Sequence, residues 1–352
     1  MAPNYALILS LLASQACAHT FIWGVFVNGV DQGTFTGIRI PGYNGQNGKG
    51  GYNNSPVKDL SSIDMRCNVM GDVQAHDTIK VTPGDNLTFD WHHELRNNSD
   101  EVIAYSHHGP SLIYISPDPP TNTSFVKLWH AGKIESNPFP QAGKWSTTAD
   151  IRANYGRMNV RIPAGLKAGP YLIRAEMIGL HEGDVSFAQN PRRGAQFYPD
   201  CVQIEVVEGG EVELPEGVGF PGAYSYEDPG VVHNVCPPSS FFPLRVVVGD
   251  ILIYCSTETK KPTGSAAPCP TDYVIPGPTV WSGAWPETTA VAVGPIKGVS
   301  TATPWSTWIG TNSVVTSATY VDARSQTIVG SSKYTATWSE TYASPTATAP
   351  RW

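Results

Sequence analysis

A histidine at position 19 directly follows a segment that has the features of a secretory signal peptide. Residues 1–18 contain a short apolar run at 6–13 and end in the small-x-small pattern Ala16-Cys17-Ala18. Cleavage after Ala18 would free the α-amine of His19, which could then bind a metal ion through this amine and its imidazole Nδ1. Because an α-amine titrates near ~7.7–8.0, a metal ion can displace its proton at ordinary pH. Taken alone, His19 is better explained as a residue that merely follows a cleavage site.

Other candidate ligands lie where predicted strands end. His107 follows the run 103–106, His181 closes the run 177–180, and Tyr198 precedes the alternating run 202–206. A side chain at such a position can leave the flat end of a sheet and meet a metal ion. Each also has a structural interpretation, because lone histidines are usually surface residues and a tyrosine beside a cysteine is often a core residue. The structural interpretation is favoured for three other histidines: His92, His93 and His108.

The elements that must position these residues read as β-strands. Residues 20–27 precede an Asn28-Gly29 turn, and residues 77–81 and 87–91 flank Pro83-Gly84-Asp85 as an expected hairpin. Short strands with regular turn signals predict an all-β, immunoglobulin-like or fibronectin-type antiparallel β-sandwich with long surface loops. The stretch 33–59 is expected to be one of those loops.

The composition is typical of an extracellular β-protein, and it argues against nucleic acid and membranes as partners. The chain has 352 residues, 34 of them Gly and 30 Pro, 15% charged residues and a formal charge of −7. No basic cluster indicates nucleic acid, and no run in the mature chain is long enough to cross a bilayer. A neutral partner and a monomer are expected. Four Asn-x-Ser/Thr triplets are candidate N-glycosylation sites, at Asn53, Asn86, Asn97 and Asn122.

Five cysteines remain after removal of Cys17: Cys67, Cys201, Cys236, Cys255 and Cys269. In an oxidising compartment an odd number predicts two disulfides and one free thiol. No pair has Cys-x-x-Cys spacing, which argues against a zinc site. The pairing of Cys236, Cys255 and Cys269 stays open.

The chain changes character after Gly283. The domain organisation expected is a signal peptide at 1–18, one globular domain at 19–283 and a Ser/Thr-rich, disordered tail at 284–352. Three tryptophans in the tail, Trp305, Trp308 and Trp338, allow a sugar-stacking surface as an alternative. A small disulfide-stapled cellulose-binding module is excluded, because no cysteine follows Cys269.

Taken together and in this order, six segments resemble the fungal lytic polysaccharide monooxygenases of auxiliary activity family 9, formerly glycoside hydrolase family 61. The resemblance covers about 19–283. The segments are His19, 64–68 (Asp-Met-Arg-Cys-Asn), 106–110 (Ser-His-His-Gly-Pro), 174–181 (Arg-Ala-Glu-Met-Ile-Gly-Leu-His), 194–201 (Gly-Ala-Gln-Phe-Tyr-Pro-Asp-Cys) and 273–278 (Tyr-Val-Ile-Pro-Gly-Pro). Two departures are an insertion at about 232–269 and Ala175, where many relatives have histidine.

The resemblance implies a single copper ion held by His19, His107 and Tyr198, with the tyrosine on the axis. Planar, nitrogen-rich coordination suits Cu(II). His181 and Gln196 match the pair that supports oxygen chemistry beside the metal. Cys67 and Cys201 match the disulfide of the family core. In the chain-entropy model a bridge that closes so long a loop stabilises the folded state by about 4 kcal/mol.

The activity implied is oxidative cleavage of cellulose or a related β-1,4-glucan at C1 or C4, with O₂ or H₂O₂ and an electron donor. Loop tyrosines that could stack on sugar rings are Tyr43, Tyr52, Tyr224 and Tyr226. The alternative from another class is a non-catalytic copper-binding or wall-associated protein on the same fold. A classical glycoside hydrolase needs two facing carboxylates, and no motif here singles out such a pair.

Overall fold

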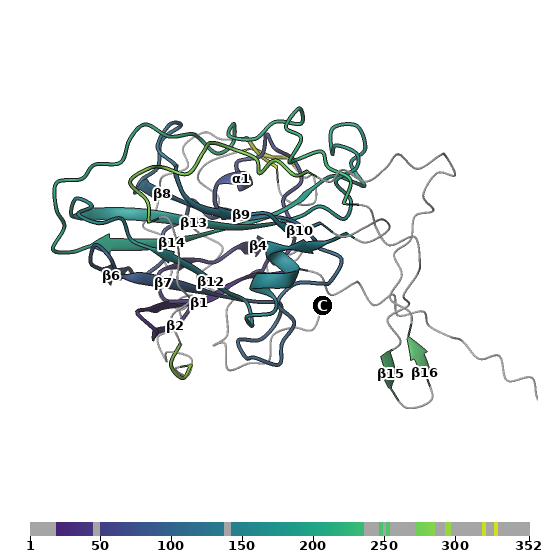
Figure 1. Ribbon diagram of the computed structural model, residues 1–352, viewed down its shortest axis with the longest axis horizontal. Coiled ribbons are helices and arrows are strands. Elements are labelled where there is room, and N and C mark those ends of the chain that lie inside the picture. Colours follow the sequence, from purple (N-terminus) through teal and green to yellow (C-terminus); the bar gives the residue numbers. More distant parts are fainter. Residues whose placement is uncertain are drawn as a thin grey trace, which may run out of the picture.

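Two stacked antiparallel sheets form the body of the protein (Figure 1). The computed structural model describes residues 19–44, 50–136, 142–235, 246–248, 251–253, 272–285, 293–296, 319–321 and 327–329. One sheet has the strand order β12-β7-β1-β2, and the other has β3-β14-β13-β8-β9 with β6 pairing in parallel to β14. The predicted β-sandwich is therefore confirmed.

The strand bounds follow the apolar runs of the sequence. The smaller sheet consists of β12 (Arg157–Arg161), β7 (Asn86–His92), β1 (Phe21–Val27) and β2 (Val30–Thr34). The larger sheet consists of β3 (Ile38–Arg39), β14 (Gln196–Val206), β13 (Gly169–Gly179), β8 (Ser111–Pro117), β9 (Val126–Ala131) and β6 (Ile79–Val81).

Shorter elements lie in the connections. Strand pairs are formed by β4 (Gly42–Asn44) with β5 (Gly50–Tyr52), β10 (Lys133–Glu135) with β11 (Lys144–Trp145), β15 (Val246–Val248) with β16 (Ile251–Ile253), and β17 (Thr319–Val321) with β18 (Thr327–Val329). Among the described residues the helical elements are α1 (Asp64–Cys67) and the π-helical segment η1 (Ser146–Ile151). Within the described ranges no helix is long and apolar enough to cross a membrane.

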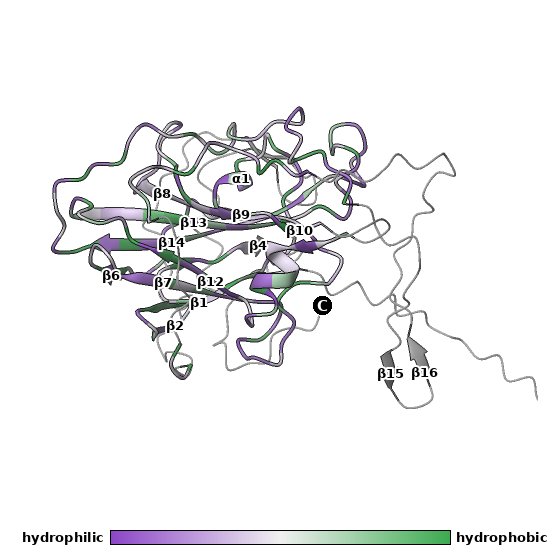
Figure 2. Ribbon diagram, viewed as in Figure 1, coloured by the Kyte–Doolittle hydropathy of each residue, from purple (hydrophilic) through white to green (hydrophobic). Residues whose placement is uncertain are grey.

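The larger sheet is buried on both of its faces. Ile173, Ala175 and Met177 of β13 belong to the core between the sheets, whereas Leu172 and Ile178 belong to a second core on the outer face. Because side chains alternate along a strand, Arg174 and Glu176 also point to the outer face, where loops cover them. Figure 2 shows hydrophobic stretches in β13 and β14.

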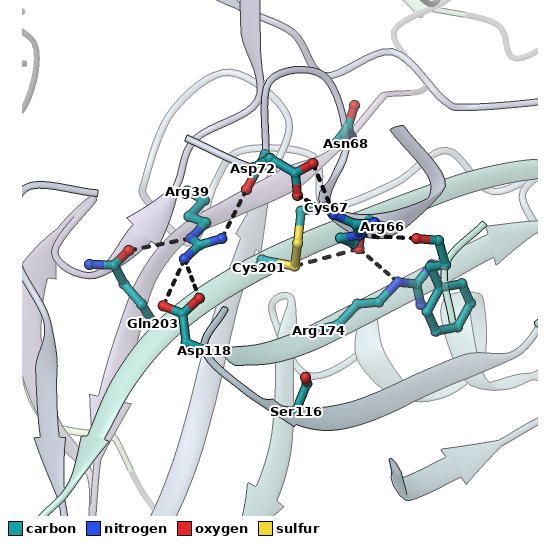
Figure 3. The surroundings of a disulfide bond; sticks show 12 residues. Arg39, Arg66, Cys67, Asn68, Asp72, Ser116, Asp118, Arg174, Cys201 and Gln203 are labelled. Carbon is teal, nitrogen blue, oxygen red and sulfur yellow. Dashed lines mark hydrogen bonds and ion pairs between the residues drawn. A yellow bond between two sulfur atoms is a disulfide. The ribbon is translucent and has the colours of Figure 1, made fainter. Parts of the chain in front are cut away.

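The disulfide implied by the resemblance is present and joins α1 to β14. Cys67 and Cys201 are bonded, with their Cα atoms 5.1 Å apart. Figure 3 shows Arg174 beneath this bridge, where its guanidinium Nε donates to the carbonyl oxygen of Arg66 at 2.9 Å. The loop that contains α1 is thus fixed to the larger sheet by a covalent bond and by buried hydrogen bonds. Cys236, Cys255 and Cys269 lie outside the described residues.

Several local expectations were wrong. Residues 77–81 and 87–91 do not form a hairpin, because β6 joins β14 in the larger sheet and β7 pairs with β1 in the smaller one. The run 103–106 lies in the loop between β7 and β8 and is not a strand. The stretch 33–59 contains strands and buried residues such as Ile38 and Val57.

Contacts with the sandwich continue beyond the expected boundary at Gly283. The Trp285 indole nitrogen donates to the Ile162 carbonyl at 3.0 Å, and Arg161 lies 4.7 Å from the Trp285 ring centroid. The Gly294 amide donates to the Gly29 carbonyl in the β1–β2 turn at 2.8 Å. Residues 272–285 and 293–296 therefore contribute contacts to the domain. The tryptophans Trp305, Trp308 and Trp338 lie outside the described residues.

Candidate functional site

The candidate metal centre is built where β1 begins beside β14. His19 lies two residues before β1, and Tyr198 is the third residue of β14. The Asp200 carboxylate accepts a hydrogen bond from the Ile22 amide at 2.6 Å and thereby joins the two strands. Burial raises the pKa of Asp200 well above its usual range. The hydrogen bond between Ile22 and Asp200 fixes the start of β1 against β14. The ring centroids of His19 and Tyr198, which lie on these two segments, are 6.5 Å apart.

His107 lies in the loop between β7 and β8, and hydrogen bonds to both its amide and its carbonyl fix its backbone. Its amide donates to the Ala104 carbonyl, and Thr147 Oγ1 donates to its carbonyl at 2.6 Å. Gly179 packs against the imidazole, since a Cβ at that position would lie 2.9 Å from His107 Cδ2. A side chain at position 179 would push the ring away, so the glycine is required by close approach.

The functional atoms of three residues meet around one point. His107 Nε2 lies 3.1 Å from the Tyr198 hydroxyl and 3.1 Å from Gln196 Oε1. The Tyr198 hydroxyl donates to Gln196 Oε1 at 2.8 Å. His107, Tyr198 and Gln196 are buried, while His19 is half-buried. The structure therefore brings the predicted ligands His107 and Tyr198 together with Gln196.

Burial keeps the imidazoles of this cluster neutral. Burial and the nearby charge of His93 lower the pKa of His19 to about 4. Burial, with the charges of His181 and His19, lowers the pKa of His107 well below its ordinary value. Burial also raises the pKa of Tyr198 well above its ordinary value, so this phenol keeps its proton. A neutral imidazole presents a free lone pair, which is the form that binds a metal ion.

The predicted supporting residue His181 lies beside His107, with the ring centroids 4.0 Å apart. The Gln196 amide nitrogen lies 3.2 Å from His181 Nε2. Burial lowers the pKa of His181 to about 4, although the neighbouring Glu182 opposes this change. Because the amide NH₂ can only donate, His181 Nε2 accepts this hydrogen bond and its ring is neutral.

Two residues that the sequence analysis missed hold Gln196 in place. The Gln196 amide nitrogen donates to Glu182 Oε2 at 3.0 Å, and the same oxygen pairs with Lys58 Nζ at 2.8 Å. Burial opposes ionisation of Glu182, but the hydrogen bond and charge of Lys58 outweigh it and lower the pKa of this carboxyl. A carboxylate only accepts hydrogen bonds, so it turns the amide nitrogen outward and the amide oxygen toward Tyr198. The position of Glu182 directly after His181 was the available sequence signal.

Glu182→Gln is expected to slow turnover by about 10-fold without changing copper affinity. A glutamine at 182 can donate as well as accept, so it no longer dictates which way the Gln196 amide points. Initial rates and copper titrations of the mature protein measure the two effects separately. Glu213→Gln, at an exposed carboxylate paired with Lys167, is the matched control. An unchanged rate in Glu182→Gln would contradict a role for Glu182 in positioning Gln196.

The four tyrosines expected to contact substrate differ in how far the structure describes and exposes them. Tyr224 is buried, and its hydroxyl donates to Glu176 Oε2 at 2.6 Å, so the substrate-contact prediction is wrong for this residue. Tyr226 is half-buried, with its hydroxyl 3.3 Å from both the Leu60 amide and the Lys58 carbonyl oxygen. The side chains of Tyr43 and Tyr52 lie outside what the structure describes.

The candidate glycosylation sites differ in accessibility. Asn122 is exposed and Asn97 is half-exposed. Asn53 is buried, and its side-chain oxygen accepts from the Ser55 amide. Asn86 is only 3% exposed and its amide donates to Thr88 within β7, so the structure argues against a glycan there. Asn97 and Asn122 stay the sites at which a glycan would reach solvent.

The donor set of the cluster fits a copper ion. It combines imidazoles kept neutral with a protonated phenol, and cleavage before His19 would add a primary amine. Nitrogen-rich sets of this kind bind Cu(II) strongly. Among the described residues no group of three or more His, Cys, Asp or Glu side chains is arranged to hold a metal ion, so a site at this cluster depends on the Tyr198 phenol and the His19 amine as further donors.

The chain is similar to known proteins over most of its length. The sequence model of Auxiliary Activity family 9 (formerly GH61) matches residues 19–241. A Schizophyllum commune protein named AA9 family lytic polysaccharide monooxygenase A is 38% identical over 280 residues, 78% of this chain and 94% of that protein. An Aspergillus fumigatus protein named AA9 family lytic polysaccharide monooxygenase C is 37% identical over 279 residues, 79% of this chain and 65% of that protein. The solved structure of CvAA9A has a TM-score of 0.58 at 30% identity and covers 76% of this chain and 99% of that chain.

Proposed function

The chain belongs to Auxiliary Activity family 9, and from this premise we propose that the mature protein is a copper-dependent monooxygenase that cleaves cellulose or a related β-1,4-glucan. The observation that carries the proposal is the convergence of His107 Nε2 on the Tyr198 hydroxyl, with His19 facing the same tyrosine. His19, through its amine and Nδ1, and His107 would hold the copper ion, and the Tyr198 hydroxyl would be a further donor beside them.

When bound, copper supplies the one-electron redox chemistry that oxidation of a strong C–H bond at C1 or C4 requires, with O₂ or H₂O₂ and an electron donor. The protein's own residues control protons around it. The Tyr198 hydroxyl keeps its proton and donates to Gln196 Oε1. Gln196 Nε2 donates to Glu182 Oε2 and to the neutral His181 Nε2, and these two bonds hold the Gln196 amide and the His181 ring in place beside His107.

The same arrangement disfavours acid–base hydrolysis. Glycoside hydrolases use two carboxyl groups that face each other across the bond to be broken. Glu182 is the carboxylate that contacts Gln196, and it is ion-paired with Lys58. A carboxylate held in that pair is poorly suited to act as the protonated acid.

The proposal places the protein outside the cell as a glycoprotein. The signal-peptide features of residues 1–18, the exposed Asn122 and the disulfide between Cys67 and Cys201 support secretion. We further propose a monomer that takes electrons from a small molecule or an enzyme and acts on an uncharged polysaccharide, a partner that agrees with a chain of net charge −7 without a basic cluster.

Incubation of the copper-loaded mature protein with swollen cellulose and ascorbate tests the proposal. Mass spectrometry is expected to detect oligosaccharides oxidised at C1 as aldonic acids, at C4 as keto sugars, or at both, and only when reductant is present. The ratio of the two products gives the regioselectivity. Copper binding without oxidised products from cellulose, xyloglucan or mixed-linkage glucan would favour the non-catalytic alternative.

A further inference from the structure

A surface pocket of about 280 Å³ lies outside the candidate metal centre, between two loops. Its lining includes Asn98, Glu101 and Tyr105 from the β7–β8 loop, and Arg152 and Tyr155 from the segment after η1. This volume lies just below the range of sites for drug-sized ligands, which suits a single sugar ring.

The pocket opens at the same end of the sandwich as His19. β1 begins with Phe21 opposite His92, where β7 ends, and β12 begins with Arg157 opposite Asp90. Both pocket loops leave the smaller sheet at this end. The link to the site is also direct, since Tyr105 lies two residues before His107. A polymer that lies across the metal centre can therefore extend into the pocket.

Two tyrosines present exposed rings in this pocket. Tyr105 is 65% exposed and Tyr155 is 53% exposed. Tyr155 has a φ of +55°, a left-handed conformation that bulky residues rarely adopt. It occurs in the turn between η1 and β12, where the Gly156 amide donates to the Ile151 carbonyl at 2.9 Å, and this turn leaves the ring at the surface.

The side chain of Arg152 packs against the ring of Tyr105. Its guanidinium carbon lies 3.2 Å from the Tyr105 ring centroid. Its Nε donates to the Ile103 carbonyl at 2.8 Å, and its Nη2 donates to Glu101 Oε1 at 3.3 Å. One face of Tyr105 is therefore supported by a fixed cation, while much of the ring stays open to solvent.

The chemistry of the lining indicates a neutral, hydroxylated ligand. The Arg152 charge is offset by Glu101, and Asp100 Oδ2 already accepts the backbone amides of residues 93–95. Arg152, the cation among the lining residues, is therefore paired, and the neighbouring Arg157 donates to Asn98 Oδ1 and lies 5.6 Å from the Tyr155 ring centroid. Aromatic faces beside Arg, Glu and Asn groups match a sugar ring, which has apolar C–H faces and hydroxyls at its rim.

We propose that this pocket is a saccharide subsite, occupied by a sugar unit of the same glucan chain that lies across the metal centre. The identity of the glycan rests on the proposed function. The rings of Tyr105 and Tyr155 stack on the sugar, and the guanidinium of Arg152 and the carboxylate of Glu101 bond its hydroxyls.

Calorimetric titration of the copper-loaded mature protein with cellohexaose tests the subsite. Tyr155→Asn removes the ring with a residue that tolerates positive φ, and Tyr105→Ser removes the second ring. Each is expected to weaken binding about 3- to 10-fold, the loss of one stacking contact. Val30→Thr, at an exposed apolar residue beyond the far end of β1, is the control and should bind as the parent does.

Product analysis on the same samples separates this proposal from the proposed function. Weakened binding in the variants supports the subsite even when the parent protein forms no oxidised product. Unchanged binding in Tyr105→Ser overturns the subsite even when the parent oxidises cellulose, and so does a parent protein that does not bind cellohexaose. Melting temperatures identify a Tyr155→Asn variant that fails to fold, in which case Tyr105→Ser decides.

Discussion

Glu176→Ala is expected to lower the free energy of unfolding by about 3–5 kcal/mol, because it leaves the Arg174 guanidinium buried without its partner charge. Both side chains are fully buried, and two hydrogen bonds join them at 2.6 and 2.9 Å. The Glu176 carboxylate also accepts from the Tyr224 hydroxyl. The change therefore removes partners from a cation and from a phenol inside the outer core of the larger sheet.

Urea unfolding of the mature protein, followed by tryptophan fluorescence, measures this loss. Glu176→Gln keeps the volume and part of the hydrogen bonding, so its loss should be smaller. Glu213→Ala breaks an exposed ion pair with Lys167 and should leave the unfolding midpoint unchanged. A Glu176→Ala protein as stable as its parent would show that the Arg174 hydrogen bonds to the Met65 and Arg66 carbonyls suffice to hold the buried cation.

His107→Ala is expected to weaken copper binding by more than about 100-fold and to abolish oxidation of glucan. Loss of a residue that merely supports a ligand costs about 10- to 100-fold in affinity or activity, and His107 would be a ligand itself. Isothermal titration with Cu(II) measures the affinity, and oxidised-product analysis measures the activity.

His108→Ala is the matched control for this change. Its imidazole Nδ1 contacts Thr148 Oγ1 at 3.0 Å and not the cluster of His107, Gln196 and Tyr198. It should retain copper binding and oxidation within about threefold of the parent. Equal copper affinity in His107→Ala and His108→Ala would show that the first histidine is not a ligand.

The sandwich was predictable from the sequence because alternating apolar runs and turn residues are local signals. The Asn28-Gly29 turn does connect β1 to β2, and both residues have positive φ. The error at Pro83-Gly84-Asp85 has a different origin, because a local turn signal does not say whether the next strand joins the same sheet. Likewise, Arg174 and Glu176 interrupt an apolar strand, and only the outer core explains their burial.

The histidines and tyrosine of the site were predictable because each belongs to a motif. Residues that hold them in place were not, since Thr147 and Asp200 act through contacts with residues distant in sequence. The same limit applies to Tyr224, whose loop position suggested exposure although its ring fills the outer core. The positive φ of Tyr155 has no sequence signature.

The role of the His19 amine is tested most directly by the copper affinity of two proteins that differ by one residue. One begins at His19, and the other retains a single alanine before it, so that the amine is displaced while the folded domain is unchanged. The account predicts that the extended protein binds Cu(II) more than about 100-fold more weakly, because it loses one ligand and the chelate ring. Equal affinities would contradict the account, since they would show that the His19 amine does not bind the metal.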